Sequence, residues 1–145
     1  MDLHEQLNKA IQIATYYHGG QVDKADEPYI LHPLWVMNNV KTLKAKIVAV
    51  LHDTVEDTGV TIHKLNAYGF DKDIVNAVYI LTRKEEQKYS DYIELIATNK
   101  IAREVKIADL SHNMDLSRLK EVTNRDEIRY TKYLNARDYL INLSY

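Results

Sequence analysis

Apolar residues recur every three to four positions along most of the chain, and this period predicts amphipathic helices. The first such stretch covers residues 3–17 and ends at the Gly19-Gly20 pair, a glycine stop. Residues 45–50 form an apolar-rich run without glycine or proline, and it continues into polar residues up to Asp57. This run predicts a buried central helix over residues 45–57. The same period predicts further helices over residues 34–43, 62–68, 74–81, 91–98, 101–114 and 126–143.

Polar residues between these stretches predict the helix ends and the loops. Thr61, Asp71 and Ser90 each precede a predicted helix and are expected to be N-caps. Residues 21–29 and residues 83–88 are polar connections. Pro33 suits the first turn of a helix, and a residue before proline prefers extended geometry. His32 is therefore expected where a loop enters the helix over residues 34–43.

Composition narrows the fold class to a single all-α domain over residues 1–145. Only four glycines and two prolines occur in 145 residues, too few for a sandwich or barrel built on tight turns. No cysteine is present, which excludes disulfides and thiolate metal sites and fits a reducing compartment. The sequence has neither a signal-peptide pattern nor an apolar run long enough to span a membrane. We therefore expect a cytoplasmic protein that does not contact membranes.

The net charge of −2 argues against a general nucleic-acid-binding surface, so an anionic ligand would need a local group of cations. No pattern in the sequence indicates an oligomeric state.

The end of the central helix carries an unusual concentration of polar residues. Positions four apart share a helix face, so His52 is expected beside Glu56 and Asp53 beside Asp57. Burying one histidine and three carboxylates costs several kcal/mol unless they pair or bind a cation. The alternative is a solvated helix end, but three neighbouring acids on a core helix favour a cation nearby.

Four residues together predict a metal site, namely His32, His52, Asp53 and Asp109. Imidazole and carboxylate ligands without sulfur suit Mn²⁺, Fe²⁺ or Zn²⁺ better than Ca²⁺. A metal that keeps an open coordination position activates water near neutral pH. Each residue alone is more often structural or solvated, and only the set favours a metal.

Five motifs in order carry a resemblance to a known family. They are His18-Gly19-Gly20-Gln21, Pro28-Tyr29-Ile30-Leu31-His32-Pro33, Leu51-His52-Asp53-Thr54-Val55-Glu56-Asp57-Thr58, Lys106-Ile107-Ala108-Asp109 and His112-Asn113-Met114. Together they resemble the hydrolase domain of RelA/SpoT homologues and the small alarmone hydrolases, which are HD-domain metal-dependent phosphohydrolases. The resemblance covers roughly residues 10–119.

The resemblance implies a helical HD fold with one Mn²⁺ held by His32, His52, Asp53 and Asp109. It implies hydrolysis of the 3′-pyrophosphate of guanosine 3′,5′-bis(diphosphate), abbreviated ppGpp, and related alarmone nucleotides, which releases pyrophosphate with GDP or GTP. Glu56 and Asp57 would position or deprotonate the attacking water, and a carboxylate one turn beyond His52 suits that role. The expected substrate-binding residues are Lys24, Tyr29, Lys106, Asn113 and Arg118. For Tyr29, a role in the core is an equal alternative.

The chain departs from the family pattern around the expected nucleotide site. Asp23 stands where the resemblance implies an arginine associated with the base, and Asp26 stands where it implies a glycine. Leu110 replaces a basic residue, and Asp115-Leu116 replaces Arg-Thr. Two alternatives therefore stay open: an HD phosphohydrolase that acts on another nucleotide, such as an adenine alarmone or a nucleoside monophosphate, and a non-catalytic nucleotide-binding module.

Overall fold

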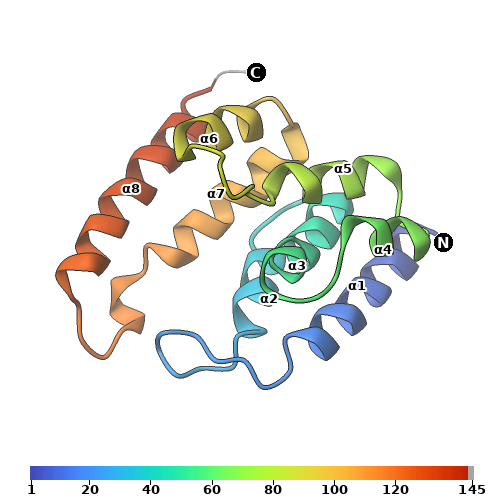
Figure 1. The fold of residues 1–145 in the computed structure, drawn as a ribbon, viewed down its shortest axis with the longest axis horizontal. Coiled ribbons are helices and arrows are strands. Elements are labelled where there is room, and N and C mark those ends of the chain that lie inside the picture. The colour runs from blue at the N-terminus through green and yellow to red at the C-terminus, as the bar shows by residue number, and fades with distance from the viewer. Residues whose placement is uncertain (144–145) are drawn as a thin grey trace.

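A computed structural model describes residues 1–143 as a set of packed helices, which confirms the predicted all-α class. Their order along the chain can be followed in Figure 1. The elements are α1 (Leu3–Tyr17), α2 (Leu31–Asn38), α3 (Leu43–Asp57), α4 (Ile62–Ala67), α5 (Lys72–Leu81), α6 (Tyr89–Ala97), α7 (Lys100–Asn113), the 3₁₀ helix η1 (Leu116–Arg118) and α8 (Asn124–Ile141). Extended pairing within the described residues is limited to one isolated bridge between Val22 and Pro28.

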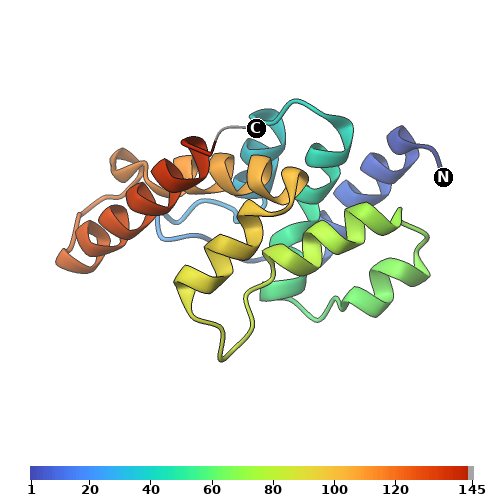
Figure 2. The same cartoon turned by 90° about the horizontal axis from the view of Figure 1, so that it is seen from above.

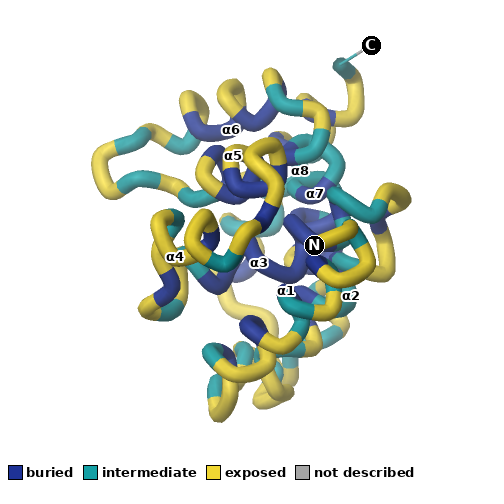
Figure 3. Tube along the Cα trace, turned by 90° about the vertical axis from the view of Figure 1, so that its right-hand side faces the viewer, coloured by how far each residue is buried: buried dark blue, intermediate teal, exposed yellow. Residues whose placement is uncertain are grey.

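Helix α3 is the centre of the core. It packs against α1, α2, α5 and α7, and its residues 47–54 are all buried. The buried band along α3 is visible in Figure 3. Thr42 begins the helix because its hydroxyl accepts a hydrogen bond from the Ala45 N–H at 3.1 Å. A helix buried on nearly all sides holds its last turn in a fixed place, and this turn carries the polar residues predicted to be functional.

The helices around α3 extend to two opposite ends of the molecule (Figure 1, Figure 2). Helices α1 and α4 lie at one end of the molecule and α8 at the other, as two perpendicular views show (Figure 1, Figure 2). Helix α8 packs on α7 and touches α6. The polar loop over residues 21–29 and the connection between α7 and α8 lie on the same side of the molecule, where ion pairs join them (Figure 1). No helix among residues 1–143 is both long and apolar enough to cross a bilayer.

Helix α2 differs most from its prediction, since it spans Leu31–Asn38 rather than residues 34–43. It ends early because Lys46 of α3 donates hydrogen bonds to the Met37 and Val40 carbonyls, at 3.1 and 2.9 Å. Asn39 adds a side-chain bond to the Trp35 carbonyl at 2.8 Å. These contacts satisfy carbonyls that a continuing helix would have used. His32 consequently lies inside the first turn of α2 rather than before it.

The other helix ends follow the predictions with small shifts. Thr61 caps α4 as expected, through a 3.1 Å bond from the Lys64 N–H. Asp71 precedes α5 as expected, but its carboxylate accepts from the Gln6 amide at 3.1 Å instead of capping the helix. Ser90 lies inside α6, whose N-cap is Lys88, so the Ser90 prediction is wrong. The helical period of the sequence does not predict the short helix η1.

Candidate active site

Three helices bring the predicted metal ligands together. His32 comes from the first turn of α2, Asp109 from the end of α7, and His52 and Asp53 from the end of α3. All four are buried, and one potential ligand atom from each lies within 4.8 Å of every other. The His32 Nε2 atom lies 2.8 Å from Asp109 Oδ1, and the His52 Nε2 atom lies 3.1 Å from Asp53 Oδ1. Such a tight set of two imidazoles and two carboxylates has the composition of a divalent cation site.

The His52 ring tests whether a cation fits. Its Nδ1–H donates to the Ala49 carbonyl at 2.9 Å, which leaves Nε2 as the atom that faces the other ligands. That Nε2 is buried and has no hydrogen-bond partner within the described residues. A backbone bond to the far nitrogen is the usual way to fix a metal-ligating imidazole. The orphaned nitrogen therefore fits a bound cation.

The same carboxylates make the site attract positive charge. Burial lowers the pKa of His52, but Asp53 and Asp109 outweigh burial and raise that pKa to about 9. A proton and a divalent cation thus compete for this position. Burial also works to raise the pKa of Asp109, but Lys106, 3.1 Å away, and the nearby histidines hold it well below the usual range. Asp109 is therefore ionised and ready to bind a cation.

His32 is held from behind by a second histidine. The two Nδ1 atoms of His32 and His112 lie 2.7 Å apart, and the His112 ring stacks on Trp35 with centroids 4.4 Å apart. Burial and the neighbouring His32 lower the pKa of His112 to about 4, so His112 is neutral and can accept a hydrogen bond. His32 can then donate through Nδ1 and present Nε2 without a proton to a cation.

Glu56 and Asp57 line the same cavity as three of the predicted ligands, His32, Asp53 and Asp109. This cavity, called the metal hollow here, has a volume of about 250 Å³. Both carboxylates are exposed by surface area because they face the open hollow, yet surrounding protein raises the pKa of each above its ordinary value. Glu56 accepts a bond from the Arg83 N–H at 2.8 Å. Carboxylates with a raised pKa beside a cation site are suited to proton transfer.

Tyr29 connects the 21–29 loop to this cluster. Its hydroxyl lies 2.8 Å from Asp53 Oδ2 and 3.2 Å from Asp57 Oδ2, and its ring packs near His18 with centroids 5.0 Å apart. Burial, followed by Asp53, raises the pKa of Tyr29. The protonated hydroxyl therefore donates to the end of α3.

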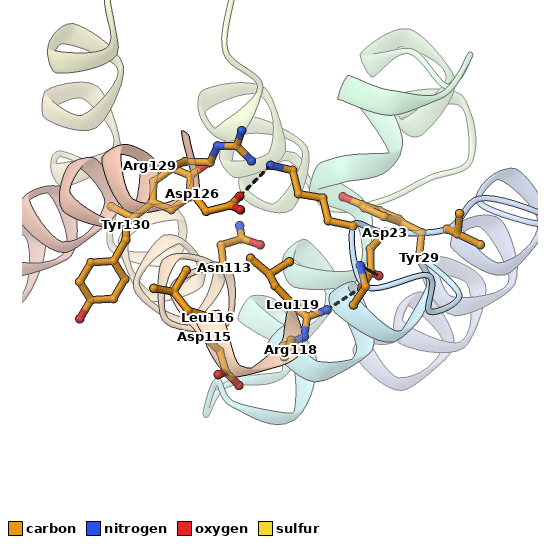
Figure 4. Close-up of a pocket in the computed structure, with 14 residues that line it drawn as sticks. Asp23, Tyr29, Asn113, Asp115, Leu116, Arg118, Leu119, Asp126, Arg129 and Tyr130 are labelled. Carbon is orange, nitrogen blue, oxygen red and sulfur yellow. Dashed lines mark hydrogen bonds and ion pairs between the residues drawn. The ribbon is translucent and has the colours of Figure 1, made fainter. Parts of the chain in front are cut away.

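A second hollow of about 350 Å³ opens beside the metal hollow (Figure 4). It lies between the 21–29 loop and the segment from η1 into α8. Both hollows are lined by Asp23, Tyr29, Asn113, Arg118 and Tyr133. The walls of the second hollow also include Val22, Lys24, Ala25, Leu116, Leu119, Asp126, Arg129 and Tyr130.

Three ion pairs join the 21–29 loop to the segment from η1 into α8, and two of them lie on the walls of the second hollow. They are Arg118–Asp23 at 2.6 Å, Lys24–Asp126 at 3.5 Å and Lys120–Asp26 at 3.1 Å. Asp26 has a φ of 61°, the left-handed region that glycine adopts without strain and aspartate tolerates better than most residues. This backbone geometry accounts for the glycine that the family resemblance implies at this position.

Comparison with known proteins adds relatives but no matching family model. A probable GTP pyrophosphokinase of Mycobacterium leprae is 33% identical over 120 residues, which cover 74% of this chain and 15% of the relative. A guanosine-3′,5′-bis(diphosphate) 3′-pyrophosphohydrolase of Aquifex aeolicus is 32% identical, covering 77% and 17%. The bifunctional (p)ppGpp synthase/hydrolase SpoT of Escherichia coli is 29% identical, covering 78% and 18%. The chain thus spans less than a fifth of the length of these relatives.

A solved structure agrees in fold. It is described as a metazoan ortholog of SpoT that hydrolyses ppGpp, and it superposes with a TM-score of 0.74 at 21% identity, over 94% of this chain and 85% of that one. The chain resembles a RelA/SpoT-type HD hydrolase domain in sequence and in fold. Its HD pair is His52-Asp53, at the buried end of α3.

All residues predicted for the site of this HD domain lie along the two hollows or directly behind them. Asn113 lies at the junction, with its Nδ2 atom 3.5 Å from Asp109 Oδ1. Arg118 lies at the same junction, and Lys24 lies on the wall of the second hollow.

Sequence reasoning missed several residues at this site. His112 belongs to the His112-Asn113-Met114 motif, but the sequence alone assigns it no role. The pairing of Asp23 with Arg118 had no local signal, because 95 positions separate the two. Arg129, Tyr130 and Tyr133 lie on α8, beyond the range of the family resemblance. Asp126 stands three residues after Thr123, a capping-box pattern that could have placed both at the start of α8.

Proposed function

We propose that this HD domain hydrolyses the 3′-pyrophosphate of ppGpp and related alarmone nucleotides, releasing pyrophosphate with GDP or GTP. The observation that carries the proposal is the orphaned Nε2 of His52, within a buried His and Asp set that opens toward Glu56 and Asp57. Some relatives that match this chain are named for the synthesis of such nucleotides, and others for their hydrolysis. A cation site beside two proton-accepting carboxylates favours hydrolysis.

The proposed cofactor is Mn²⁺, with Fe²⁺ or Zn²⁺ as chemically similar substitutes. His32, His52, Asp53 and Asp109 would hold it. When bound, a divalent cation lowers the pKa of water and offsets charge on phosphoryl oxygens. The buried carboxylates and imidazoles of this site suit these metals.

The proposed reaction is attack of water on the phosphorus attached to the 3′ oxygen of the ribose. The bond from phosphorus to the 3′ oxygen breaks, that oxygen takes up a proton, and pyrophosphate leaves. Glu56 or Asp57 accepts the proton of the attacking water, because each lines the hollow with a raised pKa. Lys106 and Asn113 lie beside Asp109, where they can contact the phosphates.

The proposed partner is a small nucleotide rather than a nucleic acid. Lys24, Tyr29 and Arg118 line the second hollow, which has room for the nucleoside part of the substrate. A free nucleotide substrate and a cysteine-free sequence also fit a cytoplasmic protein.

Removal of one ligand tests the proposal. Asp53→Ala should abolish both bound Mn²⁺ and the release of pyrophosphate from ppGpp, because it deletes a carboxylate from the buried set. Elemental analysis and ion-exchange chromatography of the products measure the two effects. Asp138→Ala, a change of an exposed aspartate on α8, is the matched control. Wild-type protein loaded with Mn²⁺ that releases no pyrophosphate would contradict the proposal.

A second candidate is hydrolysis of another nucleotide, such as an adenine alarmone or a nucleoside monophosphate. It is favoured by Asp23, which stands on the wall of the second hollow where the resemblance implies an arginine. A panel of guanine and adenine nucleotides separates the two. A strong preference for ppGpp over its adenosine counterpart and over nucleoside monophosphates would exclude this candidate.

A further inference from the structure

The Arg118–Asp23 ion pair stands at the junction of the two hollows. The Arg118 Nη2 atom donates to Asp23 Oδ2 at 2.6 Å, and both residues line both cavities. The side chains are 27% and 13% exposed, so the pair is only partly open to solvent. In Figure 4 the pair closes one side of the second hollow. The guanidinium therefore belongs to the junction that a ligand extending from one hollow into the other would meet.

Asp23 is fixed by its own loop. Its Oδ1 atom accepts from the Ala25 N–H at 2.8 Å and from the Glu27 N–H at 3.1 Å. Its backbone N–H donates to the Glu27 carbonyl at 2.9 Å. The carboxylate therefore has one oxygen tied to the loop and the other directed at Arg118. Such an arrangement orients the planar guanidinium before any ligand arrives.

The two hollows differ in chemistry. The metal hollow is lined by three of the predicted cation ligands and by the charged Lys106, and this lining suits phosphate groups. The second hollow is lined by apolar and aromatic side chains, including Leu116, Leu119 and Tyr130. Two of its three cations, Lys24 and Arg118, are already paired with carboxylates, and the third, Arg129, comes from α8. A paired guanidinium exerts little net charge, but its flat face can still stack on an aromatic ring.

We infer that the guanidinium of Arg118 is the surface on which the base of the nucleotide packs, and that Asp23 is the positioning residue that holds it there. The inference rests on the proposed function, because it assigns the nucleoside end of that substrate to the second hollow. The base would then pack on an arginine from η1. Position 23 of the 21–29 loop, where the resemblance implies an arginine, carries an aspartate instead.

Two substitutions at Arg118 test the stacking role. Arg118→Gln should raise the KM for ppGpp about tenfold or more, with little change in kcat or in bound Mn²⁺, because stacking contributes to binding and not to the reacting centre. Arg118→Lys keeps the positive charge but loses the planar guanidinium, so its KM for ppGpp should rise as much as that of Arg118→Gln. A KM near the wild-type value in Arg118→Lys would mean that Arg118 binds phosphate by charge, and it would overturn the base assignment.

The positioning role of Asp23 has its own test. Asp23→Asn should raise KM less than Arg118→Gln does, and the double variant should be no worse than Arg118→Gln alone. Exchanging the pair, Asp23→Arg with Arg118→Asp, should recover part of the binding that Arg118→Asp loses. Lys120→Gln is the matched control, because the exposed Lys120–Asp26 pair joins the same two segments and lines neither hollow. If Lys120→Gln raises KM as much as Asp23→Asn does, the Asp23–Arg118 pair only holds the two segments together and Asp23 has no positioning role.

Binding without turnover separates this inference from the proposed function. Calorimetric titration with ppGpp and with its adenosine counterpart, in the presence of a chelator, gives Kd values that need no hydrolysis. Wild-type protein that binds either nucleotide but releases no pyrophosphate contradicts the proposed function, while the Kd of Arg118→Gln still decides the inference. Unchanged Kd in Arg118→Gln, or wild-type protein that binds neither nucleotide, overturns the inference.

Discussion

The hydroxyl of Tyr29 links the 21–29 loop to Asp53, a proposed metal ligand. It donates toward Asp53 and Asp57, and it keeps its proton because burial and Asp53 raise its pKa. A hydroxyl in this position orients a ligating carboxylate, and the loss of such partners typically costs ten- to a hundredfold in metal affinity or activity. Tyr29 therefore acts from behind the ligand, whatever contact its ring makes with a nucleotide.

Tyr29→Phe should lower kcat and Mn²⁺ affinity each by roughly tenfold, because Asp53 and Asp57 lose a shared donor. Steady-state kinetics and metal titration measure the two effects. Tyr16→Phe is the matched control, since Tyr16 is 78% exposed on α1 and lines neither hollow. A Tyr29→Phe variant with wild-type metal affinity and kcat would show that the hydroxyl is dispensable.

The raised pKa of Glu56 predicts how kcat depends on pH in the acidic range. Burial raises its pKa, and the bond from the Arg83 N–H only partly opposes this effect. A general base works in its unprotonated form, so activity is lost as pH falls through the raised pKa. We therefore expect kcat to fall on acidification at a pH above the ordinary pKa of glutamate, in a profile measured across the acidic and neutral range.

Glu56→Gln should lower kcat by about 10²–10⁴-fold at neutral pH while bound Mn²⁺ stays unchanged. Asp57→Asn is the comparison, because both carboxylates line the hollow with a raised pKa. A larger loss of kcat in Asp57→Asn would transfer the role of base to Asp57.

Single residues also mark the limit of sequence reasoning. His52 and Asp53 could be singled out because polar residues end a buried helix, and the motifs linked them to His32 and Asp109. The Asp23–Arg118 pair and the His32–His112 contact could not be predicted, because residues 95 and 80 positions apart meet only through tertiary packing. Residue types alone give no signal for such pairs.

At the scale of elements, periodicity placed the long helices well, and tertiary contacts set the ends that it misplaced. Helix α1 has the predicted range, because its apolar stripe and glycine stop are both local signals. Helix α2 ends early because Lys46 of another helix binds its last carbonyls. The Asp71 side chain does not cap α5, because its carboxylate accepts a hydrogen bond from Gln6, 65 positions away. Propensity cannot anticipate a partner from another helix.

The start of α8 gives a prediction at this scale. The Thr123 hydroxyl accepts from the Asp126 N–H at 3.2 Å, and Asp126 Oδ2 accepts from the Thr123 N–H at 2.9 Å. Thr123→Ala removes half of this capping box and should cost about 1 kcal/mol of unfolding free energy. Urea unfolding measures the change. Thr131→Ala, at an exposed position inside α8, should stay within about 0.5 kcal/mol of wild type. Equal stability of Thr123→Ala and wild type would contradict the capping role.

For the whole molecule, the proposed cation site joins helices that are distant in sequence. Its ligands come from α2, α3 and α7, so a bound cation links the centre of the core to two surrounding helices. Because the assembled site requires the fold, a cation should bind the folded chain far better than the unfolded one. Binding free energy then adds to unfolding free energy, by about 2.7 kcal/mol when free metal exceeds Kd a hundredfold.

Mn²⁺ should therefore raise Tm, and the rise should grow with pH. Without metal, Asp53 and Asp109 raise the pKa of His52 to about 9, so a proton stabilises the folded site at neutral pH and is lost as pH rises toward 9. The cation must displace that proton, so its stabilising effect is smaller at about pH 6.5 than at about pH 8.5. Thermal unfolding with Mn²⁺ or with a chelator at both pH values measures the two shifts. Asp53→Ala should show neither shift. A Mn²⁺-dependent rise in Tm that survives in this variant, or one that shrinks as pH rises, would mean that the cation binds elsewhere on the molecule.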